Sequence, residues 1–212
     1  MKEIHITFVR HGTTKYNEED RVQGSSDIPL SKKGFDEINN VHIEDPNFDA
    51  FFHSPLSRSK DTLLGIMEKY NMSNNNIFES HLISERSYGV FEGLTKRQIE
   101  IQMPRLYNKW CLNENVVGEK IEPIECVIDR VEEFIAKIIS YEYENILAVT
   151  HSGLLYALFK YITKRPLHLK PSQIEESFPN CCVCKLILNL TLERMEMTFI
   201  VNNNHYKKIL TY

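Results

Sequence analysis

The stretch "ITFVRHGTTKYN" (Ile6–Asn17) carries the main indication of the fold, because an apolar run stops there at Arg10 and His11. The run from Ile4 to Val9 is short and bounded by turn residues, which is typical of a strand that is buried on both faces. Two later runs have the same character and predict two further buried strands, at 48–52 and 146–149.

Helical stretches follow the second and the third of these runs. The stretch 54–70 begins with Ser54 as the expected N-cap, and the stretch 151–162 is apolar enough for a buried helix. The clearest amphipathic helix is expected within 124–143, directly before the third run. Strands that alternate with helices predict an α/β fold, here a three-layer α/β/α sandwich around a mostly parallel sheet.

Two other parts of the chain differ from this alternation. Residues 181–203 predict a pair of strands around a turn near 192–194, at or near an edge of the sheet. Residues 86–123 are polar and broken by glycine and proline, and Thr95 with Gln98 predicts one short capped helix there. We expect a single domain, 1–212, in which residues 86–123 form a small cap segment over a site.

Composition and charge exclude several functions. The 25 Lys and Arg residues against 29 Asp and Glu give a net charge of −4, so we expect neither nucleic acid nor a membrane surface as a partner. No apolar stretch is long enough for a signal peptide or a membrane span, which predicts a cytoplasmic protein. The five cysteines are expected to be reduced thiols, and neighbouring residues of "CCVC" point to opposite faces of a strand, so no metal site is expected.

Basic side chains stand at the end of each predicted buried strand. Arg10 and His11 follow the first strand, and the group at the end of the others comprises His53, Arg58 and His151. Because ligands of open parallel sheets bind beyond the carboxyl ends of the strands, we expect these groups to converge. A histidine at a strand end is by itself weak evidence, but the whole set, with helix N-termini beside it, predicts a site for an anion such as phosphate.

Five motifs in sequence order resemble those of the histidine phosphatase superfamily, which comprises cofactor-dependent phosphoglycerate mutases and related phosphatases. The resemblance runs from Ile4 to at least Gly153, and "PNCCV" at 179–183 also fits. The motifs are "VRHGTTKYN" (9–17), "RVQGSSDIPLSKKG" (21–34), "HSPLSRSKDT" (53–62), "SERSYGVFEG" (84–93) and "VTHSG" (149–153).

The resemblance implies a catalytic role for five residues. His11 is expected to be the nucleophile that forms a phosphohistidine, and Glu85 to be the proton donor. The phosphoryl oxygens are expected to bind Arg10, Arg58 and His151. Phosphoryl transfer fits this set, because it depends on positioning and on neutralising charge, which arginine does with two donors at once.

Chemistry adds two conditions for these roles. His11 attacks only as a neutral imidazole, so we expect its other ring nitrogen to donate to a backbone carbonyl. Glu85 must be protonated, which requires a raised pKa.

Asn17 is expected to complete the binding site. Thr14, Gln23, Gly24 and Ser152 are further candidates for substrate binding, although turn and cap roles explain these four equally well.

The branch of the family decides between two reactions. We expect hydrolysis of a small phosphomonoester, without metal or cofactor, because Glu92 resembles the phosphatase branch and because the cap segment is shorter than the mutase insertion. The alternative is a phosphoglycerate mutase, since "ERSYG" with Lys96 resembles the mutase pattern. A non-catalytic phosphate-binding module is disfavoured by the presence of both His11 and Glu85. The sequence does not determine the oligomeric state, and a homodimer is possible. It also assigns no role to the cap cations Lys96, Arg97 and Arg105.

Overall fold

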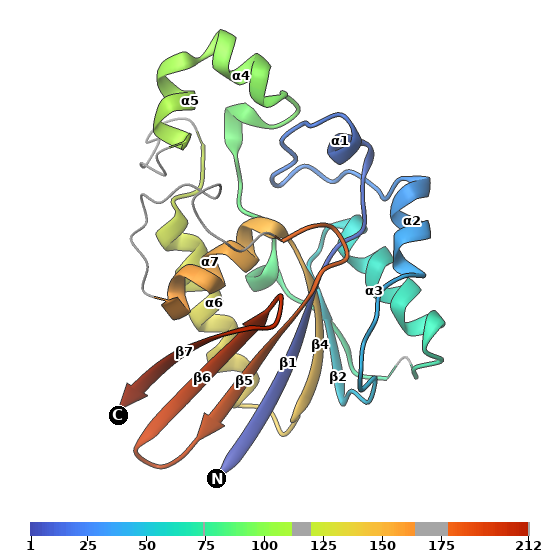
Figure 1. The fold of residues 1–212 in the computed structure, drawn as a ribbon, viewed down its shortest axis with the longest axis vertical. Coiled ribbons are helices and arrows are strands. Elements are labelled where there is room, and N and C mark those ends of the chain that lie inside the picture. Colours follow the sequence, from blue (N-terminus) through green and yellow to red (C-terminus); the bar gives the residue numbers. More distant parts are fainter. Residues whose placement is uncertain (74, 112–119, 164–177, 212) are drawn as a thin grey trace.

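A mixed sheet forms the centre of the molecule (Figure 1). The computed structural model describes residues 1–73, 75–111, 120–163 and 178–211, and within them the strand order is β3-β2-β4-β1-β5-β6-β7. The strands are β1 (Lys2–Arg10), β2 (Ala50–His53), β3 (Ile77–Glu79), β4 (Asn145–Thr150), β5 (Val183–Leu190), β6 (Arg194–Val201) and β7 (Asn204–Thr211). The pairings β1–β4, β2–β4 and β2–β3 are parallel. The pairings β1–β5, β5–β6 and β6–β7 are antiparallel.

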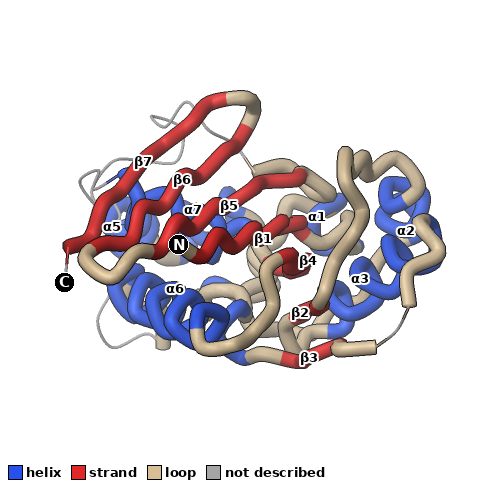
Figure 2. The backbone as a smooth tube through the Cα atoms, turned by 90° about the horizontal axis from the view of Figure 1, so that it is seen from below, coloured by secondary structure: helices blue, strands red, loops and turns tan. Residues whose placement is uncertain are grey.

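Helices cover both faces of the sheet, which Figure 2 shows from below with β3 and β7 at its edges. One face packs against α2 (Lys32–Ile38) and α3 (Ser57–Lys69), and the other against α6 (Ile124–Ile139) and α7 (Ser152–Thr163). The remaining elements lie near the carboxyl ends of β1, β2 and β4 or in the connections. They are the helices α1 (Lys15–Glu18), α4 (Lys96–Gln102) and α5 (Pro104–Cys111) and the 3₁₀ turns η1 (His81–Ile83) and η2 (Gly89–Phe91).

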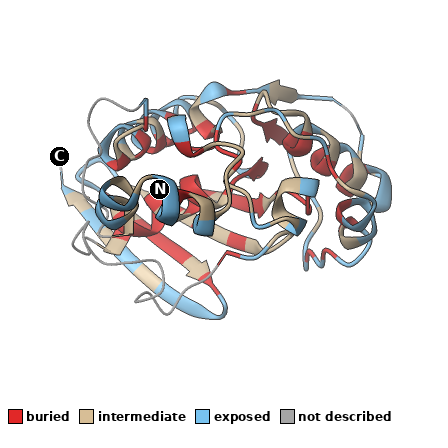
Figure 3. Cartoon of the chain, turned by 90° about the horizontal axis from the view of Figure 1, so that it is seen from above, coloured by how far each residue is buried: buried red, intermediate tan, exposed pale blue. Residues whose placement is uncertain are grey.

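The central strands are apolar throughout because each contributes to two cores. In β4, Ile146 and Ala148 pack on the side of α6 and α7, whereas Leu147 and Val149 pack on the side of α2 and α3. This alternation follows from the two-residue period of a strand. Buried residues accordingly run along the strands and the inner faces of the helices (Figure 3).

The predicted α/β class and the layered arrangement are confirmed. The three predicted strands correspond to β1, β2 and β4, and the predicted C-terminal pair corresponds to β5 and β6. The antiparallel half of the sheet is larger than expected, because β7 adds a third strand beyond that pair. The short edge strand β3 was not predicted either.

Two local predictions have different outcomes. Thr95 and Gln98 do form the capping box that begins α4. The prediction that Ser54 caps α3 is wrong, because that helix begins at Ser57 and its N-cap, Leu56, has no side-chain cap hydrogen bond. Of the cap segment, residues 112–119 lie outside the described part of the chain. No helix in the described part is long and apolar enough to cross a membrane.

Candidate active site

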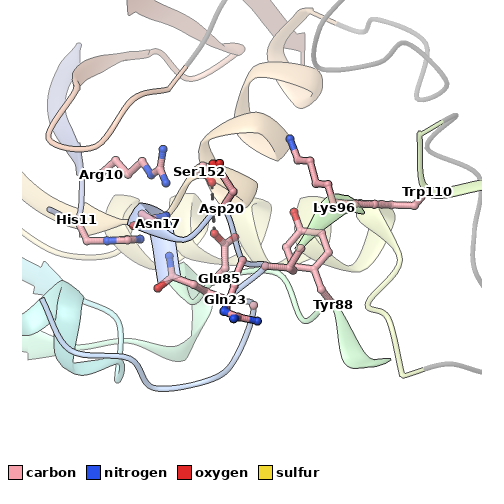
Figure 4. Close-up of a pocket in the computed structure, with 13 residues that line it drawn as sticks. Arg10, His11, Asn17, Asp20, Gln23, Glu85, Tyr88, Lys96, Trp110 and Ser152 are labelled. Atoms are coloured by element: carbon pink, nitrogen blue, oxygen red, sulfur yellow. Dashed lines mark hydrogen bonds between the residues drawn. The ribbon is translucent and has the colours of Figure 1, made fainter. Parts of the chain in front are cut away.

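Three strand ends bring distant parts of the chain together. His11 directly follows β1, Arg58 lies in the first turn of α3 after β2, and His151 directly follows β4. Beside them a cavity of about 340 Å³ opens between these strand ends and the cap segment (Figure 4). The residues that line it are Arg10, His11, Asn17, Asp20, Arg21, Val22, Gln23, Gly24, Glu85, Tyr88, Lys96, Trp110 and Ser152.

His11 is held as a neutral ring. Its side chain is buried, and Nδ1 lies 2.7 Å from the carbonyl oxygen of Gly12. A carbonyl only accepts, so Nδ1 carries the proton and Nε2 keeps a free lone pair. Burial lowers the pKa of His11 well below its ordinary value of 6.5, and the charges of Arg10 and Arg58 lower it further.

Backbone carbonyls hold the two arginines. Arg58 is fully buried, and its Nη1 and Nη2 donate to the carbonyl oxygens of Ser26, at 2.7 Å, and Gly24, at 2.8 Å. Nη1 of Arg10 donates to the carbonyl oxygen of Phe178 at 2.6 Å. Because these acceptors are neutral, they fix each guanidinium without cancelling its positive charge.

The loop that holds Arg58 is itself organised by Glu92. The Oε1 atom of Glu92 accepts from the backbone N–H groups of Ser25, at 2.9 Å, and Tyr88, at 3.0 Å, while Oε2 accepts from the backbone N–H of Ser26 at 3.1 Å. Burial opposes ionisation of Glu92, but these bonds, together with those from the serine hydroxyls, lower its pKa. Gly24 has a φ of +56°, which favours glycine, and a Cβ there would lie 2.1 Å from Glu92 Oε1, so a larger residue would displace this carboxylate.

His151 is oriented by Ser54. Their Nε2 and Oγ atoms are 2.7 Å apart, and the same Oγ accepts from the backbone N–H of Leu56 at 3.3 Å. The ring centroids of His151 and His11 are 5.1 Å apart. Burial lowers the pKa of His151 well below its ordinary value, and the nearby Arg58 adds to this effect. Ser54 therefore positions a site residue instead of capping α3.

Three buried side-chain nitrogen atoms have no hydrogen-bond partner among the described residues. They are Nε of Arg10, Nε of Arg58 and Nδ1 of His151, and all three belong to the predicted site. An unpaired buried polar group costs about 1–3 kcal/mol, and more when it is charged. Such groups call for an explanation, and three unpaired nitrogens, two of them on arginines, are donors of the kind that bind an anion.

Glu85 lies on the other side of the cavity, below Ser152 in Figure 4. Its Oε1 accepts from the backbone N–H of Arg86 at 2.8 Å, and its Oε2 lies 3.5 Å from the Ser152 hydroxyl. Burial raises the pKa of Glu85, although the backbone N–H groups of Arg86 and Gly153 and the charges of Arg58 and Arg10 act in the opposite direction. A Cβ on Gly153 would come within 2.2 Å of Glu85 Oε1, so the glycine makes room for the carboxyl group.

The secondary candidates divide into two groups. Asn17, Gln23, Gly24 and Ser152 line the cavity, as does Lys96 from the cap. Thr14 does not line it; its hydroxyl caps α1 and donates to Gln23 Oε1 at 2.8 Å. The cap cations Arg97 and Arg105 are also absent from the lining, as are the deeper side chains of Arg58 and His151.

Several lining residues were not singled out from the sequence. Tyr88 and Arg21 lie within the quoted motifs, so their position there was the available signal. Trp110, the single tryptophan of the chain, has its ring 5.3 Å from that of Phe91 and 5.9 Å from that of Tyr88. Nothing in the local pattern of α5 distinguishes this ring from an ordinary packing residue. Within the described part of the chain, no three His, Cys, Asp or Glu side chains form a group that could hold a metal ion.

Known proteins resemble this chain in sequence and in fold. The sequence model of the histidine phosphatase superfamily (branch 1) matches residues 6–200. The chain is 31% identical over 160 residues to a probable 2-carboxy-D-arabinitol-1-phosphatase of Arabidopsis thaliana, which covers 72% of the chain and 32% of the plant protein. The chain thus spans about a third of that relative's length.

A phosphoglycerate mutase is also similar in sequence, and a solved structure is similar in fold. The chain is 28% identical over 187 residues to the 2,3-bisphosphoglycerate-dependent phosphoglycerate mutase 2 of Gloeobacter violaceus, covering 84% of the chain and 82% of the mutase. The structure of Bacillus stearothermophilus YhfR matches with a TM-score of 0.77 and 24% identity, covering 94% of the chain and 95% of that protein. Phosphatases and mutases are therefore both among the relatives.

Proposed function

Because the chain belongs to the histidine phosphatase superfamily, we propose that it hydrolyses phosphomonoesters through a phosphohistidine intermediate on His11. The observation that carries the proposal is the set of three unpaired buried nitrogens, on Arg10, Arg58 and His151, beside the free Nε2 of His11. These groups supply positive charge and hydrogen-bond donors for the equatorial oxygens of a phosphoryl group. The charge on those oxygens is what phosphoryl transfer requires a protein to stabilise.

In the first step the lone pair on Nε2 of His11 attacks phosphorus, and the bond from phosphorus to the ester oxygen breaks. Glu85 gives its proton to the departing oxygen, which leaves as an alcohol. The phosphorylated ring is cationic, and the Gly12 carbonyl that accepts from Nδ1 stabilises this charge. Burial raises the pKa of Glu85, which favours the protonated carboxyl that this step requires.

In the second step Glu85, now a carboxylate, takes a proton from water. The oxygen of that water attacks phosphorus, the phosphorus–nitrogen bond breaks, and inorganic phosphate leaves. His11 regains its neutral form and Glu85 its proton, so that the cycle closes. Asn17 and Gln23 line the cavity near the phosphoryl position and are expected to assist in binding.

Hydrolysis is favoured over mutase activity by the charges that the cap presents. A mutase must hold a second anionic group of the substrate during transfer, and of the cap cations Lys96, Arg97 and Arg105 only Lys96 lines the cavity. Mutase activity is the second candidate, because Lys96 is placed to meet such a group and a mutase is among the relatives.

Turnover of p-nitrophenyl phosphate in the presence of a chelator tests the proposal. We expect release of p-nitrophenol by the wild-type protein, loss of at least about a thousandfold in H11A, and unchanged turnover in H42A, whose exposed histidine lies outside the cavity. An acid-labile phosphoryl group should be trapped on the wild-type protein and not on H11A. An inactive wild type or an active H11A contradicts the mechanism. Efficient conversion of 3- to 2-phosphoglycerate with little phosphate release contradicts the choice of hydrolysis.

A further inference from the structure

An ion pair outside the cavity lining contacts the backbone that carries Glu85. Glu122, at the end of the cap segment, and Arg130, on α6, meet with two parallel contacts: Nε to Oε1 at 2.9 Å and Nη2 to Oε2 at 3.0 Å. Both side chains are about one-fifth exposed. This two-point geometry fixes the planes of both groups relative to each other, as a single contact does not.

The pair also holds the backbone on both sides of Glu85. The remaining guanidinium nitrogen of Arg130, Nη1, donates to the carbonyl oxygens of Leu82 and Ser84, each at 3.0 Å. On the other side, Oε2 of Glu122 accepts from the backbone N–H of Ser87 at 3.1 Å, and its own backbone N–H donates to the Ser87 carbonyl at 2.9 Å. The segment 82–87 is therefore clamped before and after Glu85.

Arg86 links this clamp to the carboxyl group itself. Its Nε donates to the backbone carbonyl of Glu122 at 2.7 Å, while its backbone N–H donates to Glu85 Oε1 at 2.8 Å. The Thr150 hydroxyl, at the end of β4, donates to the Ile83 carbonyl at 2.8 Å and ties the same segment to the sheet. The hydrogen bond from the Arg86 backbone N–H to Glu85, at 2.8 Å, is shorter than the 3.5 Å contact between Glu85 and the Ser152 hydroxyl.

We propose that the Glu122–Arg130 pair positions Glu85 for proton transfer to the leaving group. Neither residue lines the cavity, so both act as positioning residues through the segment 82–87. The proposal rests on the proposed function, because it assigns a task to supports of the proposed proton donor. A proton donor that is misplaced by about 1 Å loses much of its effect, so groups that fix its backbone bear directly on the rate.

Two substrates with different leaving groups distinguish a role in positioning Glu85 from a merely structural role of the ion pair. A p-nitrophenolate departs without a proton, whereas the alkoxide of glycerol 2-phosphate needs one. The ratio of kcat/KM values for the two esters therefore reports proton donation during formation of the phosphohistidine, and the shared dephosphorylation step does not enter kcat/KM. A general loss of folded protein or of phosphate binding lowers both values alike.

The variants are R130M, which keeps an unbranched apolar stem but not the guanidinium fork, and E122Q. We expect kcat/KM for glycerol 2-phosphate to fall by about 10- to 100-fold and that for p-nitrophenyl phosphate by less than about threefold, since general acid catalysis is worth about 10²- to 10⁴-fold. E85Q should show the same selectivity more strongly, and adding R130M to E85Q should change the ratio little further. The matched control is K207M, which breaks the more exposed Lys207–Glu196 pair.

Equal losses on both esters, or no loss on either, overturn the positioning role. If R130M does not fold, as judged by thermal unfolding, the same measurement on E122Q decides. A wild-type protein that hydrolyses neither ester overturns the proposed function and the positioning role with it. An active wild type with unselective variants overturns the positioning role alone, so the two failures are distinguishable.

Discussion

At the scale of single residues, the resemblance implied which residues form the site, and chemistry set the conditions that His11 and Glu85 must meet. The expectation that His11 donates from one nitrogen to a backbone carbonyl matches its 2.7 Å contact with Gly12, and the expected rise in the pKa of Glu85 matches its burial. Ser54 was misread because a serine before proline has the pattern of an N-cap, and its partner His151 lies 97 residues away. Contacts across such separations leave no local signal.

Glu92 gives a prediction at this scale. Both of its carboxylate oxygens accept from backbone N–H groups, so E92Q must turn an amide NH₂ toward at least one of these donors. The loop 24–26 then loses a charge-assisted hydrogen bond, and the carbonyls that hold Arg58 shift. We expect the competitive inhibition constant of inorganic phosphate to rise about tenfold, which corresponds to about 1.4 kcal/mol.

The control for this prediction is E193Q, an exposed glutamate in the turn between β5 and β6. The two inhibition constants are measured against the wild type with one ester at one pH. An inhibition constant of E92Q equal to that of E193Q would show that Arg58 does not depend on this loop.

At the scale of helices and strands, prediction succeeded where burial on two faces left a continuous apolar run. β1, β2 and β4 are of this kind. β3 was missed because it has only three residues, none of them fully buried, after an asparagine-rich tract. β7 was missed because none of its eight residues is fully buried, so that no apolar run marks it. A half-exposed edge strand depends on its neighbour more than on its own composition.

Helix α6 provides a prediction at this scale. The ring of Phe134 is buried and lies 5.5 Å from that of Phe52, edge to face, and 6.2 Å from that of Phe8. Removing it leaves a cavity between α6 and two strands. We expect F134A to lower the free energy of unfolding by about 3–5 kcal/mol, measured by urea denaturation. E133A, at the exposed neighbouring position, should change it by less than about 0.5 kcal/mol. A loss below about 1 kcal/mol in F134A would contradict the packing described here.

At the scale of the whole molecule, the site lowers stability in acid. His11 and His151 are buried with pKa values well below 6.5, so below that pH the unfolded chain binds protons that the folded chain does not. The free energy of unfolding therefore decreases as the pH falls from 6.5 toward the folded pKa values, with a slope of up to about 1.4 kcal/mol per pH unit for each histidine. Glu85 acts in the opposite direction, because its raised pKa lets the folded chain keep a proton that the unfolded chain loses above 4.5.

H11Q tests this linkage. Below pH 6.5 the unfolded chain binds a proton at His11 that the folded chain does not, and replacing the histidine removes this difference in bound protons. The slope of unfolding free energy against pH should therefore decrease by about 1.4 kcal/mol per pH unit below 6.5. Urea denaturation at a series of pH values from 7 downward measures it. Parallel curves for wild type and H11Q would mean that the folded protein binds a proton at His11 as readily as the unfolded chain does.

The way in which the cap segment is joined to the rest of the molecule affects how freely its sequence and length can change. Its two ends lie side by side, since Tyr88 and Ile121 form a β-bridge and Ser87 bonds to Glu122. An insertion with adjacent ends can grow, shrink or be exchanged without moving the strands on either side, and doubling a loop's length costs only about 0.6 kcal/mol. The cap is therefore the part whose length laboratory recombination can change, provided that a graft keeps Glu92 and Glu122, which bond to the loop 24–26 and to Ser87.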